Sequence, residues 1–311
     1  MRLLTSGLHH VTAIARNAHK TAAFYGDVLG MRVVKQTVNF DDTNTYHLYF
    51  GDPEGRPGTL LTFFVRPDAD TGRAGSGQAV SVRFAVPAGS LSSWSARLAR
   101  RGVRFTEDDR FECGALTCAD PDGLDVQLVA TGAAEDPGSA QYRDVPVGCS
   151  IRGLHSIGLA IADAGPTAAL LTHELGFVET LGNGGRRRFR AAGEGPGLFV
   201  DLLAGPATLP GSMGVGCVHH VAFRARDPRE QLAWQHQLRT AGLDATDVRD
   251  RKYFRSIYFN EPGGVRFEIA TDTPGFAVDE SPRDLGSRLQ LPLSLESQRE
   301  RLEAGLGVLP V

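Results

Sequence analysis

Short apolar runs alternate with glycine- and proline-containing turns along the whole chain, and one order of elements occurs four times. Each unit opens with a strand-like run, continues into a helical segment, and closes with strand-like runs on either side of a Pro/Gly turn. The openings lie at residues 8–11, 79–82, 154–157 and 218–221. The pattern predicts four βαβββ modules, at about residues 7–66, 78–131, 151–205 and 215–273.

Glycines mark the expected end of each helix. Gly30, Gly102, Gly176 and Gly242 follow the last periodic residues, and glycine readily takes the left-handed conformation that stops a helix. The fourth helix also has a start signal in residues 227–230, Asp-Pro-Arg-Glu, which resembles a capping box with aspartate as the cap.

Modules of this size bury little apolar surface alone, so we expect them to pack in pairs. The prediction is an α+β fold with modules paired into cupped mixed sheets. Residues 1–131 would form an N-terminal domain and residues 149–273 a C-terminal domain, joined by a linker rich in Gly, Ala, Asp and Pro at 131–148. Residues 274–311 form a tail with a short helix expected at about 295–302.

The composition limits the classes of molecule that this protein is expected to bind. The 311 residues carry a formal net charge of −3, which provides no basic field for nucleic acid or an anionic membrane, so a small-molecule partner is expected. No run of eighteen apolar residues predicts a membrane span, and the cytoplasm is the expected location. The four cysteines lack the spacing of a zinc site and are interpreted as reduced thiols. Exposed sheet edges would favour a homodimer.

Three longer strings narrow the interpretation further. They are residues 250–259, DRKYFRSIYF, residues 261–264, EPGG, and residues 46–50, YHLYF. Together with the four modules, they make the chain resemble the vicinal oxygen chelate (glyoxalase/bleomycin resistance/dioxygenase) superfamily over nearly its whole length. Within that superfamily the chain is similar to the ring-cleaving hydroquinone dioxygenases. The resemblance implies paired βαβββ modules around a divalent metal.

Two of the openings contain adjacent histidines, His9-His10 and His219-His220. Neighbouring strand residues point to opposite faces, so one histidine of each pair is expected to face the cup. The resemblance selects the second, which predicts His10 and His220 as metal ligands with Glu268 from the last strand. Aligning the openings places Val82 and Ser156 in the same column, and the column of Glu268 contains Thr62, Gln127 and Asp201. The first and fourth modules would therefore build one metal site, and the middle two would be scaffolding.

Threonine at position 62 separates two classes of function. By resemblance, a glyoxalase-type isomerase has four protein ligands, two of them carboxylates, and threonine does not easily replace that acid. Two histidines and one carboxylate leave coordination positions open, as in non-haem Fe(II) oxygenases. The cofactor prediction is therefore Fe(II), with Mn(II) sharing the same ligand preferences, and the partners are an aromatic diol and O2.

The resemblance also implies roles around the metal. Tyr258 and His219 are candidate acid–base groups, Arg251 would stabilise negative charge, and Thr12 and His9 would contact substrate. Strand alternation turns His9 away from the metal, and His219 too unless its strand is distorted. The remaining histidines, His47 and His155 among them, are interpreted as structural.

The predicted activity is Fe(II)-dependent cleavage of a hydroquinone-type (1,4-dihydroxy) ring with incorporation of both oxygen atoms. The alternatives are a catechol extradiol dioxygenase, a glyoxalase-type isomerase or lyase, and a non-catalytic binding protein. A catechol enzyme would, by resemblance, have all three ligands in the C-terminal half, where Ser156 fills the first histidine position.

Overall fold

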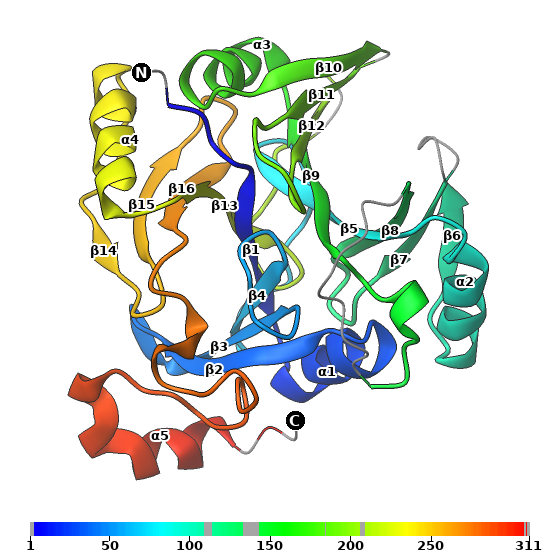
Figure 1. Ribbon diagram of the computed structural model, residues 1–311, viewed down its shortest axis with the longest axis vertical. Coiled ribbons are helices and arrows are strands. Elements are labelled where there is room, and N and C mark those ends of the chain that lie inside the picture. Colours follow the sequence, from blue (N-terminus) through cyan, green and yellow to red (C-terminus); the bar gives the residue numbers. More distant parts are fainter. Residues whose placement is uncertain are drawn as a thin grey trace.

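Four βαβββ modules follow one another along the chain, as predicted, in a computed structural model that describes residues 3–108, 114–132, 143–183, 185–205, 209–307 and 309 (Figure 1). The first module contains β1 (Leu8–Ala15), α1 (Ala18–Ala22), β2 (Arg32–Asn39), β3 (Asp42–Gly51) and β4 (Leu60–Val65). The second contains β5 (Gln78–Pro87), α2 (Leu91–Arg100), β6 (Phe105–Asp108), β7 (Ala115–Ala119) and β8 (Asp125–Thr131).

The other two modules repeat this order. The third contains β9 (Gly153–Ile161), α3 (Ala164–Ala169), β10 (Val178–Asn183), β11 (Arg186–Arg190) and β12 (Phe199–Ala204). The fourth contains β13 (Val218–Ala225), α4 (Pro228–Thr240), β14 (Arg249–Asp250), β15 (Arg255–Asn260) and β16 (Arg266–Thr271). Helices α1 and α3 continue into single π-helical segments, η1 (Ala23–Val28) and η3 (Leu170–Glu174). The predicted α+β class is confirmed.

The structure contains the helix-ending glycines and the α4 cap that the sequence predicts. Gly30, Gly102, Gly176 and Gly242 have φ angles of 68°, 70°, 75° and 83°, the left-handed region that L side chains avoid. At the start of α4 the Asp227 side chain accepts from the amides of Arg229 and Glu230 at 2.8 and 2.9 Å. The Glu230 carboxylate returns to the amide of Arg226 at 2.6 Å rather than to that of Asp227, so the box closes one residue earlier than predicted.

The modules combine into two eight-stranded mixed sheets. The first and fourth modules form the order β14-β15-β16-β13-β1-β4-β3-β2, and the second and third form β10-β11-β12-β9-β5-β8-β7-β6. The antiparallel pairs β1·β13 and β5·β9 join the modules at the centre of each sheet. Each of the expected domains, 1–131 and 149–273, therefore contributes one of its two modules to the first sheet and the other module to the second sheet. In the linker between them, residues 133–142 lie outside the described part of the chain.

The two faces of the first sheet are covered differently. Helix α4 packs against β13, β15 and β16 on one face. On the cup side, Tyr49, Leu60 and Ala222 join an apolar cluster with Phe276 and Leu285 of the tail. The tail therefore covers the apolar end of the cup, and the strands surround its polar centre.

The described part of the tail contains three short helical segments, η4 (Phe276–Val278), η5 (Leu293–Gln298) and α5 (Arg299–Leu306). The helix expected at 295–302 is found, but it extends further in both directions and begins as a 3₁₀ helix. The tail is anchored on β2 and β3: the Lys35 ammonium binds Asp279 at 2.6 Å and also Glu280, and the Tyr46 hydroxyl donates to the carbonyl of Gly307 at 2.6 Å.

Two smaller predictions concern thiols and membranes. Cys118, Cys149 and Cys217 are free thiols, and Cys113 lies outside the described residues. Within the described part of the chain, no helix combines the length and the apolar character that a membrane span requires.

Candidate metal centre

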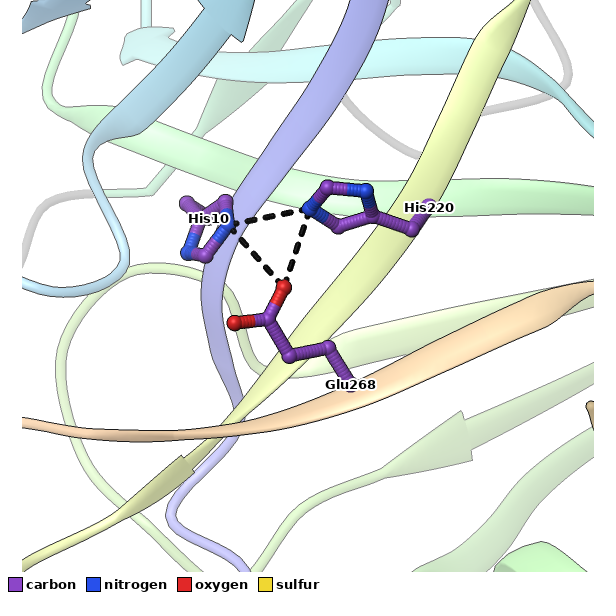
Figure 2. Close-up of side chains that lie close together, drawn as sticks. All are labelled: His10, His220 and Glu268. Atoms are coloured by element: carbon purple, nitrogen blue, oxygen red, sulfur yellow. Dashed lines mark hydrogen bonds and ion pairs between the residues drawn. The ribbon is translucent and has the colours of Figure 1, made fainter. Parts of the chain in front are cut away.

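Three side chains from three adjacent strands converge on one point of the cup. His10 comes from β1, His220 from β13 and Glu268 from β16 (Figure 2). In the sheet register His10 and Glu268 are both Cα partners of Ala222, which lies two residues after His220. Because alternate strand residues share a face, the register directs all three side chains to the same side of the sheet. The predicted grouping across the first and fourth modules is thus present.

The trio is tightly packed and sealed from solvent. His10 Nε2 lies 3.3 Å from His220 Nε2, and Glu268 Oε2 lies 3.4 Å from His10 Nε2 and 2.9 Å from His220 Nε2. The three residues are 1%, 4% and 0% exposed. Burial alone would raise the pKa of Glu268, but the two imidazoles beside it hold that pKa well below its usual range. Burial also lowers the pKa of His220. An ionised carboxylate beside neutral imidazole nitrogen is the state in which these groups bind metal ions.

The hydrogen bonding leaves a place for a cation. Glu268 Oε1 accepts from the Ser256 hydroxyl, whereas buried Oε2 accepts no hydrogen bond despite its short distance to His220. A buried carboxylate oxygen without a donor is costly unless another positive group compensates it. Two imidazole nitrogens and this oxygen form a ligand set suited to Fe(II), Mn(II) or Zn(II), so the residues fit a divalent metal.

Each of the two candidate histidine ligands has the preceding histidine as its second partner. His9 Nδ1 lies 2.9 Å from His10 Nδ1, and His219 Nδ1 lies 2.8 Å from His220 Nδ1. Strand alternation is expected to turn His9 away from the metal, and its ring lies behind His10, against Nδ1. The β1·β13 register shifts at both histidine pairs, between Leu8 and His10 and between Thr12 and Ala13. A bulge re-aims the side chain it carries. The condition set for His219, a distorted strand, is met.

The contacts of His9 determine the protonation of His10. His9 Nε2 lies 3.2 Å from the carbonyl of Thr271, which only accepts, so this nitrogen carries the proton. Burial lowers the pKa of His9 well below the usual value, which keeps the ring neutral and leaves Nδ1 bare. His10 must then donate from Nδ1, and its Nε2 lone pair faces the trio. Fixing a ligand's tautomer in this way is the usual task of a residue behind a metal ligand.

A chain of hydrogen bonds borders the trio on the β3–β4 side. Thr12 Oγ1 and Thr62 Oγ1 are 2.8 Å apart, Thr62 Oγ1 is 2.9 Å from His47 Nε2, and His47 Nδ1 is 2.9 Å from the Tyr49 hydroxyl. Thr12 is the register partner of both Thr62 and His220. The interpretation of His47 as structural missed its place beside the centre. The alternation of His47 and Tyr49 on one face of β3 was the available signal.

Tyr258 and Arg251 form the opposite wall. Tyr258 is the register partner of Glu268, and its ring centre lies 5.7 Å from that of His220. Arg251 Nε donates to the Tyr258 hydroxyl at 3.3 Å, and its Nη2 binds Asp41 at 2.8 Å. Burial raises the pKa of Tyr258, so its hydroxyl keeps its proton at neutral pH.

A small cavity of about 30 Å³ lies between these walls. That is the room of one or two water molecules. Its aromatic lining comes from Phe40, Tyr49, Phe64, Phe254 and Tyr258, with His10, Asn39, His47, His220 and Arg251 supplying polar groups. Binding of a ring therefore requires side chains of the lining to move.

The equivalent position in the second sheet contains no such trio. By register Asp201 corresponds to Glu268, Ser156 to His220, and Ser81 to His10. The predicted alignment of Val82 with His10 is therefore wrong by one residue, because the register shift at Ala79–Ser81 repeats the shift at Leu8–His10.

Three arginines, Arg83, Arg186 and Arg188, supply positive charge to Asp201 in this second sheet. Arg83 Nη1 binds Asp201 Oδ2 at 2.7 Å, and Arg83 Nε donates to Gln127 at 2.7 Å. A Cβ at Gly158 would collide with Ser81 and crowd the Arg83 guanidinium, so glycine makes the room. Within the described residues, the His10 trio is the group of ligand atoms close enough to share an ion.

Comparison with known proteins agrees with this architecture. The family described as Glyoxalase/Bleomycin resistance protein/Dioxygenase superfamily matches residues 7–128 and 153–269. "Putative ring-cleaving dioxygenase MhqO" of Bacillus subtilis (strain 168) is 41% identical over 302 residues, covering 97% of this chain and 96% of the relative. "Chlorohydroquinone/hydroquinone 1,2-dioxygenase" of Sphingobium indicum is 34% identical over 307 residues, covering 95% and 94%.

Solved structures extend the likeness to three dimensions. The crystal structure of "putative dioxygenase from Bacillus subtilis subsp. subtilis str. 168" has a TM-score of 0.95 at 40% identity and covers 99% of both chains. Glyoxalase I from Zea mays, at 14% identity and a TM-score of 0.63 over 86% of this chain and 92% of that one, shares the fold alone. With both halves matched and all four modules in place, the chain belongs to the glyoxalase/bleomycin resistance protein/dioxygenase superfamily.

Proposed function

We propose that this protein is a ring-cleaving dioxygenase that uses Fe(II) to open a hydroquinone-type (1,4-dihydroxy) aromatic ring. The observation that carries the proposal is the ligand set. Two histidines and one carboxylate converge, and Thr62 stands at the fourth position, where the resemblance implies an acid in a glyoxalase-type isomerase. The names of the relatives, among them a chlorohydroquinone/hydroquinone 1,2-dioxygenase, support this class of reaction and substrate.

His10, His220 and Glu268 would hold the metal. When bound, the iron supplies neighbouring coordination positions for a substrate oxygen and O2, and the redox chemistry that joins them. Mn(II) accepts the same ligands. Ser256 holds one carboxylate oxygen of Glu268, so the other remains directed at the two imidazoles.

The residues around the metal ligands would transfer a proton, stabilise negative charge and contact the substrate. Tyr258 faces the cavity with its proton retained, which suits it to return a proton to the opened ring. Arg251, bound to the Tyr258 hydroxyl, places a positive charge beside any negative charge that develops there. Thr12 borders the trio as a contact for a substrate oxygen.

His9 and His219 lie behind the ligands. Burial lowers the pKa of His219 to about 3, so its ring is neutral at physiological pH, and its Nδ1 faces His220. We therefore assign His219 to proton transfer only through its effect on His220. His9 acts on His10 in the same way, and a direct contact of His9 with substrate is not part of the proposal.

Oxygen uptake tests the function. The protein is reconstituted with Fe(II) without air, and O2 consumption is followed on adding hydroquinone or catechol. We expect one O2 per hydroquinone, both atoms of ¹⁸O₂ in the product, and loss of uptake in His10→Ala. His155→Ala is the matched control, because it changes the equivalent of His219 in the sheet without a metal site.

The outcomes separate the alternatives. Bound metal with no uptake on any diol would contradict the dioxygenase and favour a redox-silent isomerase, which Thr62→Glu would then be expected to improve. Faster uptake with catechol would contradict the hydroquinone assignment alone. The predicted cytoplasmic location and homodimer remain proposals, and light scattering coupled to gel filtration tests the dimer.

A further inference from the structure

The second sheet, which lacks the metal centre, contains the larger cavity of the two cups. Its volume is about 360 Å³, whereas the cavity beside the His10 trio has about 30 Å³. At the strand positions where the first sheet has His10 and Thr62, the second sheet has Ser81 and Gln127, and both of these line the cavity. The volume lies within the range of about 300–1,000 Å³ that small-molecule sites occupy.

Two connecting segments cover this cavity. Residues 66–77 join the first module to the second, and residues 209–217 lead into β13. The segments are bonded to each other, because Arg73 and Ser212 exchange two backbone hydrogen bonds of 2.9 Å. Together with the strands they supply an apolar part of the lining, Ala74, Ala79, Val80, Leu124 and Leu203. The cavity therefore has an apolar wall beside its polar floor.

Arginine side chains give the floor an excess of positive charge. Arg83 and Arg186 line the cavity, and they bind Asp201 at 2.7 and 3.0 Å. Arg188 binds the same carboxylate at 2.7 Å, and Asp125 is a further acid of the lining. Burial lowers the pKa of Arg83 to about 10, so its guanidinium stays charged at neutral pH. Three guanidiniums and two carboxylates leave one positive charge, which a bound anion would balance.

A buried hydroxyl points to a ligand at the same place. Ser81 is 3% exposed, and among the described residues its Oγ has no hydrogen-bond partner. Leaving a buried hydroxyl without a partner costs free energy, and a ligand that accepts from it would remove that cost. Ser81 and Arg83 are two residues apart on β5, so they share the face that the cavity adjoins. Gln127 accepts from Arg83 Nε at 2.7 Å and holds the guanidinium in place.

We propose that the cup of the second sheet binds a small organic carboxylate, with the carboxylate at Ser81, Arg83 and Arg186. The organic part would lie against Leu124 and Leu203. Guanidinium groups suit this ligand because their parallel N–H donors match the two oxygens of a carboxylate. One excess positive charge balances a monoanion but not a doubly charged phosphate. The ligand class is therefore a carboxylate monoanion with an apolar body.

Fluorine NMR with 4-fluorobenzoate tests this site. The whole chain is first freed of metal with a chelator, so the probe has no ion to bind at the His10 trio. We expect saturable binding that weakens about tenfold or more in Arg186→Gln, which loses a charged donor, and about three- to tenfold in Ser81→Ala. Arg187→Gln is the matched control. This neighbour on β11 faces away from the cup and binds Glu179 at 2.6 Å, so its replacement should leave the affinity unaltered.

Two competitors test the class of ligand. 4-Fluorobenzamide keeps the ring without the charge, and inorganic phosphate keeps the charge without the ring. We expect neither to displace 4-fluorobenzoate at equal concentration. Displacement by the amide would contradict recognition of the charge, and displacement by phosphate would contradict the carboxylate class. Absence of saturable binding, or equal affinity in Arg186→Gln, Ser81→Ala and Arg187→Gln, would overturn the inference.

The inference does not depend on the proposed function, since the measurement needs neither metal nor turnover. His10→Ala, which loses a candidate metal ligand, should bind 4-fluorobenzoate as the unaltered protein does. Weaker binding in this variant would place the probe in the first cup and overturn the inference. If Arg186→Gln does not fold, as circular dichroism would show, Ser81→Ala decides the test, because it removes a single oxygen and no charge.

Discussion

The tautomer of each histidine, that is, which ring nitrogen carries the proton, determines which nitrogen can face a metal in this site. His10 presents a lone pair to the trio because His9 Nδ1 accepts a hydrogen bond from its other nitrogen. His9 Nδ1 is free to accept because the single proton of that ring is on Nε2, which donates to the carbonyl of Thr271. His219 and His220 repeat the contact on β13. Each pair of adjacent histidines thus combines a candidate ligand with a supporting residue, and this arrangement requires the bulge that each strand contains.

Removing a supporting histidine should weaken metal binding without removing a ligand. We expect His9→Ala and His219→Ala each to reduce affinity for Zn(II) by about 10- to 100-fold, because the ligand ring loses the partner that fixes its tautomer. Competition with a chromophoric chelator measures the affinity. His155→Ala, the matched change in the second sheet, should leave the affinity unaltered; an equal loss there would indicate a general effect on folding.

Helix ends and strand registers account for most of the local structure. The α4 cap is the clearest case, since the Asp227 carboxylate satisfies two of the free amides at the helix start. Asn17 and Asp163 cap α1 and α3 in the same way, whereas Ser90 before α2 makes no such hydrogen bond.

Loss of this cap should have a measurable and limited cost. We expect Asp227→Ala to lower the free energy of unfolding by about 1 kcal/mol, while Asp227→Asn, which can still accept from the helix amides, stays close to the unaltered protein. Urea denaturation followed by circular dichroism gives both values. A similar loss in the two variants would show that charge rather than capping is responsible.

The sheet without a metal site should show its own dependence on pH. Burial raises the pKa of Asp201, but the hydrogen bond from Arg188 and the charges of Arg83, Arg188 and Arg186 outweigh it and lower the pKa from 3.8 to about 2. A lowered carboxylate pKa stabilises the fold above pH 3.8, and this contribution is lost as pH falls through 2. It amounts to about 2 kcal/mol.

Stability curves at pH 5 and pH 2 test this contribution. We expect the unaltered protein to lose about 2 kcal/mol more than Asp201→Asn over this interval, since asparagine does not titrate. Parallel curves would contradict the assignment of the low pKa to Asp201.

Side chains of the C-terminal tail contact the strands that form the cup. Lys35 on β2 is fully buried and binds Asp279 and Glu280, and Asp279 also accepts from the hydroxyl of Tyr253 at 3.0 Å. Tyr253 precedes Phe254, whose ring centre lies 5.1 Å from that of His10. The buried lysine therefore connects the tail to the wall of the candidate site.

Replacing this lysine should destabilise the whole protein. We expect Lys35→Met to lower the free energy of unfolding by about 3–5 kcal/mol, because it leaves Glu280 buried without its cation. Thermal and urea unfolding measure the loss. Lys20→Met changes an exposed lysine and should have little effect; equal losses would argue against the buried pair.

The sequence by itself determined the features that depend on neighbouring residues. The four modules and their helix-ending glycines could be predicted because hydrophobic period and turn residues act over a few positions. Strand alternation reduced each histidine pair to one ligand, and the resemblance to the superfamily selected His10 and His220, with Glu268 from the last strand. Pairing of the first and fourth modules also followed, since these two carry the histidines.

Only the tertiary structure decided what depends on register between distant strands. The bulges that turn His9 and His219 toward the ligands, the match of Ser81 rather than Val82 to His10, and the position of His47 beside Thr62 all arise where one strand meets another. A shift of one residue in such a pairing moves a side chain to the opposite face at little local cost, so no short-range pattern in the sequence records it.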